Sequence, residues 1–189
     1  MRILTKEEFE LEKETIMEEI WNGSVIIHPT DTIYGLGCNA LLFEAVKKIR
    51  EMKERYTNPF SVIAPSKGWI RENCLITKDA EKWIDKLPGP YTLILKLENI
   101  ECIAPNVNVD LDTLGVRMPD HWFSKVVKEL AFPVVTTSAN IEKQNFMISI
   151  EDLDPKIKSK IELMIYEGEK KGRPSKLIDL TGEERVIER

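Results

Sequence analysis

The stretch 25–39, which reads VIIHPTDTIYGLGCN, constrains the fold of this chain more than any other. Its apolar, β-branched start is typical of a buried strand, and the hydroxyls and carboxylate that follow the proline are typical of a polar cavity at a strand end. Gly35 and Gly37 lack a Cβ, so the backbone there can turn or approach a ligand closely. A strand-to-helix turn in which Thr30 and Thr32 cap backbone groups explains the same residues. A site and a plain turn both remain open from this stretch alone.

A second stretch repeats the pattern of the first. Residues 133–140, PVVTTSAN, form an apolar run that ends in hydroxyls and an amide. Two strands of this kind in one domain favour a shared polar pocket at their ends over two unrelated loops.

Helical and strand patterns alternate along most of the chain. This alternation predicts an α/β fold with a twisted, mostly mixed open sheet and flanking helices. A length of 189 residues favours one domain, residues 1–189. Asp120 is the expected cap of the fourth helix. The expected helices span 5–21, 42–53, 78–87 and 121–130, and the expected strands span 25–28, 60–64, 91–97, 113–119, 133–140, 161–166, 176–180 and 185–189.

Composition excludes several classes of protein. Apolar residues make up 42% and charged residues 31%, which is typical of a globular domain. We find no signal-peptide core and no apolar run of membrane-spanning length, so we expect a cytoplasmic protein without membrane contact. Cys38, Cys74 and Cys102 are scattered, which argues against a disulfide framework or a zinc site. The net charge of -5 argues against a broadly basic nucleic-acid surface but leaves a local basic patch open.

The helix expected over 42–53 carries a run of cations toward its end. We interpret Lys47, Lys48 and Arg50 as a solvated face that complements the helix dipole. Lys53 and Arg55 differ because they lie where the helix gives way to a loop just before a buried strand. There they can form an anion clamp, with the planar fork of arginine and the point charge of lysine.

Arg117 is the one charged residue in the apolar run 113–119. An arginine on a buried strand needs a partner, so it is half of an ion pair or a ligand for a substrate carboxylate. Taken alone, the ion pair is the favoured interpretation.

Several chemistries lack their motifs in this chain. It contains two histidines and neither GxSxG nor HExxH, so a Ser-His-Asp hydrolase or a histidine-based metal site is poorly supported, and we assign no metal ligand. Phosphate-loop and GxGxxG motifs are missing too. The remaining candidates suit binding of a polyanion and nucleotidyl transfer, in which positioning and electrostatics supply most of the catalysis. These candidates are the hydroxyls of Thr30, Thr32, Thr113, Ser138 and Ser175, the amides of Asn58 and Asn140, and the cations of Lys53, Arg55, Arg117 and Arg189.

Six motifs occur in one order along the chain, and together they point to a family. They are HPTDTIYGLG at 28–37, Lys53-Glu54-Arg55 followed by Asn58-Pro59, PGPYT at 88–92, GVRMP at 115–119, TSAN at 137–140, and Pro174-Ser175. This series closely resembles the YrdC-like threonylcarbamoyl-AMP synthases, from about Gly23 to the C-terminus. The chain ends where longer members continue, so it resembles the short, single-domain form.

The resemblance implies a YrdC-like fold with a concave cationic cavity, and an activity. Members of this family convert L-threonine, bicarbonate or CO2, and ATP into threonylcarbamoyl-AMP and pyrophosphate, with Mg2+ accompanying the ATP. A tRNA-modifying threonylcarbamoyl transferase complex then uses the product. Carried over by position, Thr32, Arg117 and Ser175 bind threonine, and Lys53 and Arg55 are the catalytic cations. Lys53, Arg55, Asn58, Thr113, Ser138, Asn140 and Arg189 bind the nucleotide.

Three departures from the family pattern accompany the match. Tyr56 stands where the family usually has proline, in a loop that is one residue shorter. The glycine that commonly follows the Ser-Ala-Asn motif is missing from 141–146, and Ile63 replaces a histidine that contacts threonine in some members. Two alternatives stay open, namely a non-catalytic, weakly RNA-binding module of the same fold and a carbamoyl-adenylate-forming enzyme.

Overall fold

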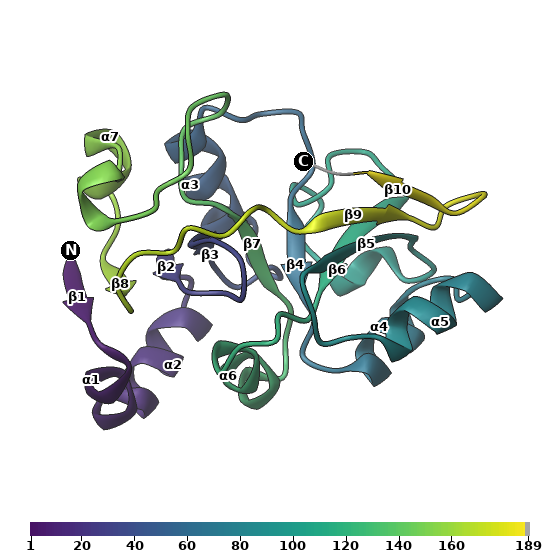
Figure 1. Ribbon diagram of the computed structural model, residues 1–189, viewed down its shortest axis with the longest axis horizontal. Helices are drawn as coiled ribbons and strands as arrows, with labels where there is room; N and C mark the ends of the chain where they lie inside the picture. The colour runs from purple at the N-terminus through teal and green to yellow at the C-terminus, as the bar shows by residue number, and fades with distance from the viewer. Residues whose placement is uncertain (188–189) are drawn as a thin grey trace.

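The computed structural model describes residues 1–187, and its ten strands join in one mixed sheet (Figure 1). The strand order is β1-β8-β2-β3-β7-β4-β6-β5-β9-β10. The strands are β1 (Arg2–Leu4), β2 (Ile26–His28), β3 (Gly35–Gly37), β4 (Ser61–Ile63), β5 (Tyr91–Lys96), β6 (Thr113–Arg117), β7 (Val134–Ser138), β8 (Leu163–Ile165), β9 (Lys176–Asp179) and β10 (Arg185–Ile187). The predicted α/β class with a mixed sheet is confirmed.

Parallel and antiparallel pairs both occur in the sheet. β8 runs parallel to β1 and β2, β4 parallel to β6, and β5 parallel to β9, whereas the other neighbours are antiparallel. The two strands with polar ends lie close together, because β3 joins β2 to β7. Val62 and Val116 are paired at the centre of the sheet. Side chains of a strand alternate between the two faces of the sheet. Each face therefore carries apolar side chains that other elements must bury.

Helices cover both faces of the sheet. One cluster packs α1 (Lys6–Leu11), α2 (Lys13–Trp21) and α6 (Phe123–Leu130) on strand residues such as Ile26 and Val134. The neighbouring Ile27 and Val135 point into the other, larger cluster. That cluster takes in α3 (Phe43–Lys53), α4 (Lys67–Asn73), α5 (Lys78–Asp85) and α7 (Pro155–Lys158). Short 3-10 turns occupy Ile100–Cys102 and Ile150–Asp152. Within 1–187, each helix is too short or too polar to cross a membrane.

Several sequence predictions about local structure were wrong. The single helix expected over 5–21 is two helices that meet at Glu12, although the predicted capping box of Thr5 and Glu8 is present. Asp120 does not cap α6; Trp122 takes that position without a side-chain bond, and the amide of Asp120 donates to Asp31. β1, α4 and α7 are elements that the sequence patterns did not reveal.

Gly35 and Gly37 lie in β3 rather than in a turn. A Cβ at Gly35 would come within 2.8 Å of Nε2 of His28, and a Cβ at Gly37 would come within 2.8 Å of the carbonyl oxygen of Val135. His28 is fully buried and stacks on Phe123, with ring centroids 4.7 Å apart. The two glycines therefore make room for the ring of His28 and for the neighbouring strand.

The segment 166–175, here called the strap, connects β8 to β9 and crosses the sheet in front of β3 and β7 (Figure 1). The hydroxyl of Tyr34 donates to the carbonyl of Gly168 at 2.7 Å and accepts from the amide of Glu167 at 2.9 Å. At Gly172 the strap lies directly on the 30–34 loop, because a Cβ there would meet the carbonyl oxygen of Thr32 at 2.3 Å. The strap therefore brings its C-terminal end to the polar strand ends.

Candidate functional site

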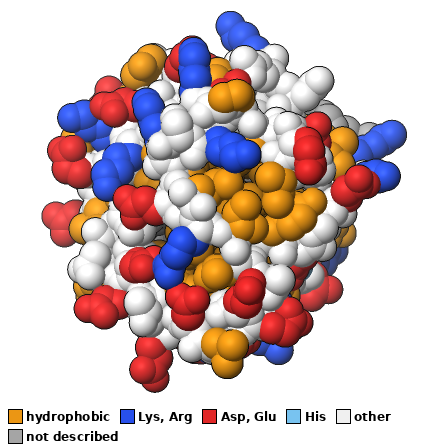
Figure 2. All heavy atoms as spheres, turned by 90° about the vertical axis from the view of Figure 1, so that its left-hand side faces the viewer, with side chains coloured by type: hydrophobic (Ala, Val, Ile, Leu, Met, Phe, Trp, Pro, Cys, Tyr) orange, Lys and Arg blue, Asp and Glu red, His pale blue; other side chains and the backbone are white. Residues whose placement is uncertain are grey.

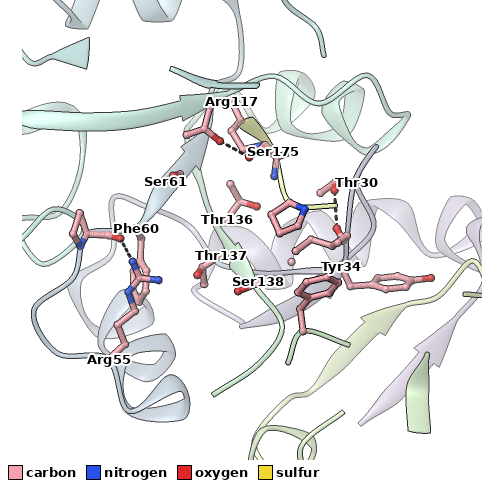
Figure 3. Close-up of a pocket in the computed structure, with 16 residues that line it drawn as sticks. Thr30, Tyr34, Arg55, Phe60, Ser61, Arg117, Thr136, Thr137, Ser138 and Ser175 are labelled. Atoms are coloured by element: carbon pink, nitrogen blue, oxygen red, sulfur yellow. Dashed lines mark hydrogen bonds between the residues drawn. The ribbon is translucent and has the colours of Figure 1, made fainter. Parts of the chain in front are cut away.

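A cavity of about 240 Å³ lies where the polar strand ends, the 55–60 loop and the strap meet (Figure 3). Of the residues to which the family resemblance gives a role, four line it, namely Arg55, Arg117, Ser138 and Ser175. The other lining residues are Thr30, Ile33, Tyr34, Gly35, Pro59, Phe60, Ser61, Thr92, Thr136, Thr137, Phe146 and Pro174. Residues far apart in the sequence thus share one polar cavity.

At one side of the cavity, the guanidinium of Arg117 is held by the 30–34 loop. Its Nη2 lies 3.1 Å from Oδ1 of Asp31 and donates to Oγ1 of Thr32 at 3.1 Å. Both members of the ion pair are nearly buried, with 8% and 11% of their side chains exposed. Arg117 therefore has the ion pair that its isolated position predicts, and it also faces the cavity.

Thr32, which accepts from Arg117, is itself buried and does not line the cavity. Its hydroxyl is 3.0 Å from that of Thr30, which donates to the carbonyl of Ile33 at 2.6 Å. Thr30 thus has the capping role that the sequence allowed, whereas the hydroxyl of Thr32 contacts Thr30 and Arg117 and no backbone group of residues 1–187. This network leaves the guanidinium little freedom to rotate.

Ser175 reaches the same side of the cavity from the end of the strap. Its hydroxyl is 2.7 Å from Oγ1 of Thr92, and both residues are buried. Thr92 belongs to β5, which pairs with β9 just beyond Ser175. The PGPYT and Pro174-Ser175 motifs therefore meet in space although more than 80 residues separate them.

Arg55 lies on another side of the cavity (Figure 3). Its Nη2 donates to the carbonyl of Pro59 at 2.6 Å, and its guanidinium carbon is 5.2 Å from the centre of the Phe60 ring. Its Nε lies 3.9 Å from a carboxylate oxygen of Glu142 and has no hydrogen-bond partner within 1–187. A cation that is only loosely paired at a cavity wall is suited to an anionic ligand.

Lys53 binds oxygen atoms of the Ser-Ala-Asn segment. Its Nζ donates to the carbonyl oxygens of Ser138 and Asn140, both at 2.6 Å, and to Oδ1 of Asn140 at 3.1 Å. The side chain is buried, and this burial together with the neighbouring Arg55 lowers the pKa of Lys53 to about 7. The three oxygens favour the ammonium form, which can donate to all of them. The structure therefore places Lys53 under the loop rather than in the cavity lining.

Asn140 completes this arrangement. Its Oδ1 accepts from the hydroxyl of Ser138 at 2.5 Å, and its Nδ2 donates to the carbonyl of Gln144 at 2.6 Å. The second bond ties down the segment after Asn140, where the family glycine is missing. Ser138 therefore faces the cavity with its hydroxyl already oriented.

Besides Lys53 and Asn140, two predicted nucleotide residues, Thr113 and Asn58, do not line the cavity. Thr113 lies at the opposite end of β6 from Arg117 and pairs with Lys96. Asn58 is exposed, and its side-chain amide donates to Glu142 at 2.5 Å. Arg189 lies outside the described residues.

Sequence reasoning missed several residues that line or support the cavity. Ser61 and Thr136 face each other on β4 and β7 and both line the cavity. A lone serine in the apolar run 60–64 was the available signal for Ser61.

The interpretation of Arg50 as a solvated cation was wrong, because it is 6% exposed and bonded to backbone carbonyls. Ile63, at the position of the family histidine, is buried in the core beneath α6.

Comparisons with known proteins agree with this fold. The model of the Sua5, YciO and YrdC family, described as "Telomere recombination", matches residues 18–189. A Methanocaldococcus jannaschii protein, provisionally named threonylcarbamoyl-AMP synthase, is 35% identical over 181 residues, which cover 94% of this chain and 84% of that protein. The threonylcarbamoyl-AMP synthase of Pyrococcus abyssi is 36% identical over 86% of this chain, but this chain spans only 48% of its length. The structure of Pyrococcus abyssi Sua5 complexed with L-threonine superposes with a TM-score of 0.88 at 31% identity, over 98% of this chain and 56% of that one.

Proposed function

Since this chain belongs to the Sua5, YciO and YrdC family, we propose that it is a threonylcarbamoyl-AMP synthase that uses L-threonine, bicarbonate and ATP. The observation that carries this proposal is the single cavity that Arg117 and Arg55 both line. Arg117 faces the cavity from the side of the 30–34 loop, and Arg55 faces it from the end of α3. An amino acid and a nucleotide triphosphate can therefore bind side by side.

The first half of the reaction joins threonine and the one-carbon unit. The threonine amine attacks the carbon of CO2 and forms an N–C bond, one C=O π bond opens to give the carbamate carboxylate, and the amine releases a proton to water. From bicarbonate the same N–C bond forms with loss of water. In our proposal Arg117 binds the threonine carboxylate, with Asp31 and Thr32 holding the guanidinium in place. Ser175 closes this half from the strap.

The second half transfers the adenylyl group. A carbamate oxygen attacks the α-phosphorus of ATP, the bond from that phosphorus to the bridging oxygen breaks, and pyrophosphate leaves. Negative charge builds up on the leaving group, and positioned cations and hydroxyls stabilise it. Arg55 and Ser138 face the cavity for this role, and Lys53 acts through the loop that carries Ser138. No covalent enzyme intermediate is needed, because the carbamate is itself the nucleophile.

Mg2+ fits this scheme as the counter-ion of ATP. Residues 1–187 contain no group of three or more histidine, cysteine or acidic side chains that could hold a metal ion, and the cavity lining offers hydroxyls and cations. This donor set does not fit a resident metal. Mg2+ bound to phosphate oxygens would arrive with the nucleotide, so we assign it no protein ligand.

The proposal is tested by pyrophosphate release from ATP and bicarbonate, with and without L-threonine. We expect release that depends on L-threonine and is not supported by carbamoyl phosphate in its place. RNA binding that persists in saturating ATP, without pyrophosphate release, would support the RNA-binding alternative instead. We further propose that a tRNA-modifying transferase uses the product and that the enzyme acts in the cytoplasm.

A further inference from the structure

Arg50 lies on α3, one turn before Lys53, and is one of the few charged residues that are buried. We propose that Arg50 is a positioning residue that fixes the backbone carrying Arg55, and thereby sets the affinity of the cavity for a nucleotide triphosphate. The identity of this ligand rests on the proposed function. The position of Arg55 does not, because it follows from contacts within the chain.

The guanidinium of Arg50 binds four backbone carbonyls. Nη1 donates to the carbonyls of Arg55 at 2.9 Å and Asn58 at 3.2 Å. Nε donates to the carbonyl of Asn106 at 2.6 Å, and Nη2 donates to that of Val107 at 3.1 Å. One side chain therefore fastens both ends of the 55–58 loop to a second loop, whose residues Asn106 and Val107 lie more than 50 positions after Arg50.

The same loop carries Arg55 to the cavity. The amide of Arg55 donates to the carbonyl of Arg50 at 3.0 Å, and Glu54 before it takes a left-handed conformation with φ of 53°. The Phe60 ring lies near both guanidinium groups, 4.4 Å from that of Arg50 and 5.2 Å from that of Arg55. Phe60 is fixed in turn, since its amide donates to the same Val107 carbonyl that Arg50 binds. Arg55 thus has its direction set by a backbone and a ring that Arg50 contacts.

This use of a guanidinium is unusual on energetic grounds. A buried charge is costly unless it is paired, and within 1–187 Arg50 has no carboxylate within ion-pair distance, whereas it lies close to the like-charged Arg55. Lysine would keep the charge but has three donors on one atom and cannot span carbonyls in this planar pattern. The geometry therefore points to the fork of Arg50, not its charge, as the feature that matters.

The test is a double-mutant cycle on Arg50 and Arg55, read as the Kd for Mg-ATP and as the KM values for ATP and L-threonine. We expect Arg50→Leu to raise the Kd and the KM for ATP about tenfold and to change the KM for threonine less than about twofold. Arg50→Lys should show the same defect. Lys48→Leu removes an exposed charge from the same helix and should match the wild type. In an Arg55→Ala background, Arg50→Leu should add less than about a twofold change.

Other outcomes would overturn the proposal. Full rescue by Arg50→Lys would assign the effect to charge, and equal effects of Arg50→Leu with and without Arg55 would assign it to general stability. Thermal unfolding identifies variants that do not fold. If Arg50→Leu does not fold, Arg50→Lys replaces it in the double-mutant cycle. A wild type that binds ATP without threonine-dependent pyrophosphate release would contradict the proposed function alone, because the Kd values would still report on Arg50. A wild type that does not bind ATP would overturn both.

Discussion

Gly172→Ala is the change that most sharply tests the role of the strap. The Cβ of the alanine would lie 2.3 Å from the carbonyl oxygen of Thr32, 3.0 Å from its carbonyl carbon and 3.3 Å from its Cα. Real Cβ contacts stay above 3.0 Å, and the atoms in the way are backbone. The strap and the 30–34 loop must therefore separate by several tenths of an ångström.

The cost of this separation should show in both stability and threonine binding. Overpacking of this kind lowers the free energy of unfolding by about 1–3 kcal/mol. Thr32 binds Arg117, and the strap ends at Ser175, so the shift also disturbs the threonine side of the cavity. A displacement of about 1 Å at a reacting centre can cost about 100-fold in rate.

The assay is pyrophosphate release at varied L-threonine, with urea unfolding of the same samples. We expect a lower kcat and a higher KM for threonine, with a smaller change in the KM for ATP. Gly182→Ala is the matched control, because a Cβ there meets nothing within 4 Å. A Gly172→Ala protein with the kinetics and unfolding midpoint of the wild type would refute the close contact between strap and loop.

Three further predictions follow from the charges in the site and the core. Arg117→Ala should remove threonine-dependent turnover while changing ATP affinity less than about threefold; equal small losses of both would contradict its assignment. Arg55→Ala should weaken ATP binding less at high salt than at low salt, because the Arg55 side chain is 25% exposed and salt screens it. The loss of ATP binding in Lys53→Met should be the same at high and low salt, because Lys53 is buried. A salt titration in which the Lys53→Met defect shrinks and the Arg55→Ala defect persists would contradict their placement. Burial lowers the pKa of His28 to about 3, so between pH 6.5 and 3 the unfolded chain holds a proton that the folded chain does not. The free energy of unfolding should therefore fall as pH falls through this window, by at most about 1.4 kcal/mol per pH unit. His28→Gln lacks this titration, so urea unfolding in which His28→Gln keeps the pH slope of the wild type would contradict the prediction.

The parts of the site that the sequence predicted are those that local patterns encode. Apolar runs that end in hydroxyls placed Thr30, Thr32 and Ser138 at strand ends, and the lone charge in an apolar strand predicted the ion pair of Arg117. In each case the signal lies within about ten residues. The ordered motifs added the family, which no single pattern could supply.

The parts that were missed depend on contacts between distant segments. Arg50 looks like a surface cation on its helix, and only Asn106 and Val107, more than 50 residues away, make it a buried one. Tyr34 and the strap are joined by bonds across more than 130 residues. The strap itself contains no regular element, so periodicity cannot reveal it.

A single cavity that joins threonine, a one-carbon unit and the adenylyl group of ATP must release all three in one product. Mass spectrometry of the products formed from L-threonine, ATP and 13C-bicarbonate measures this directly. We expect an adenylate that contains threonine and a single 13C atom and that disappears in Arg117→Ala. Formation of AMP and pyrophosphate without such an adduct, or of an adduct that lacks threonine, would contradict this expectation.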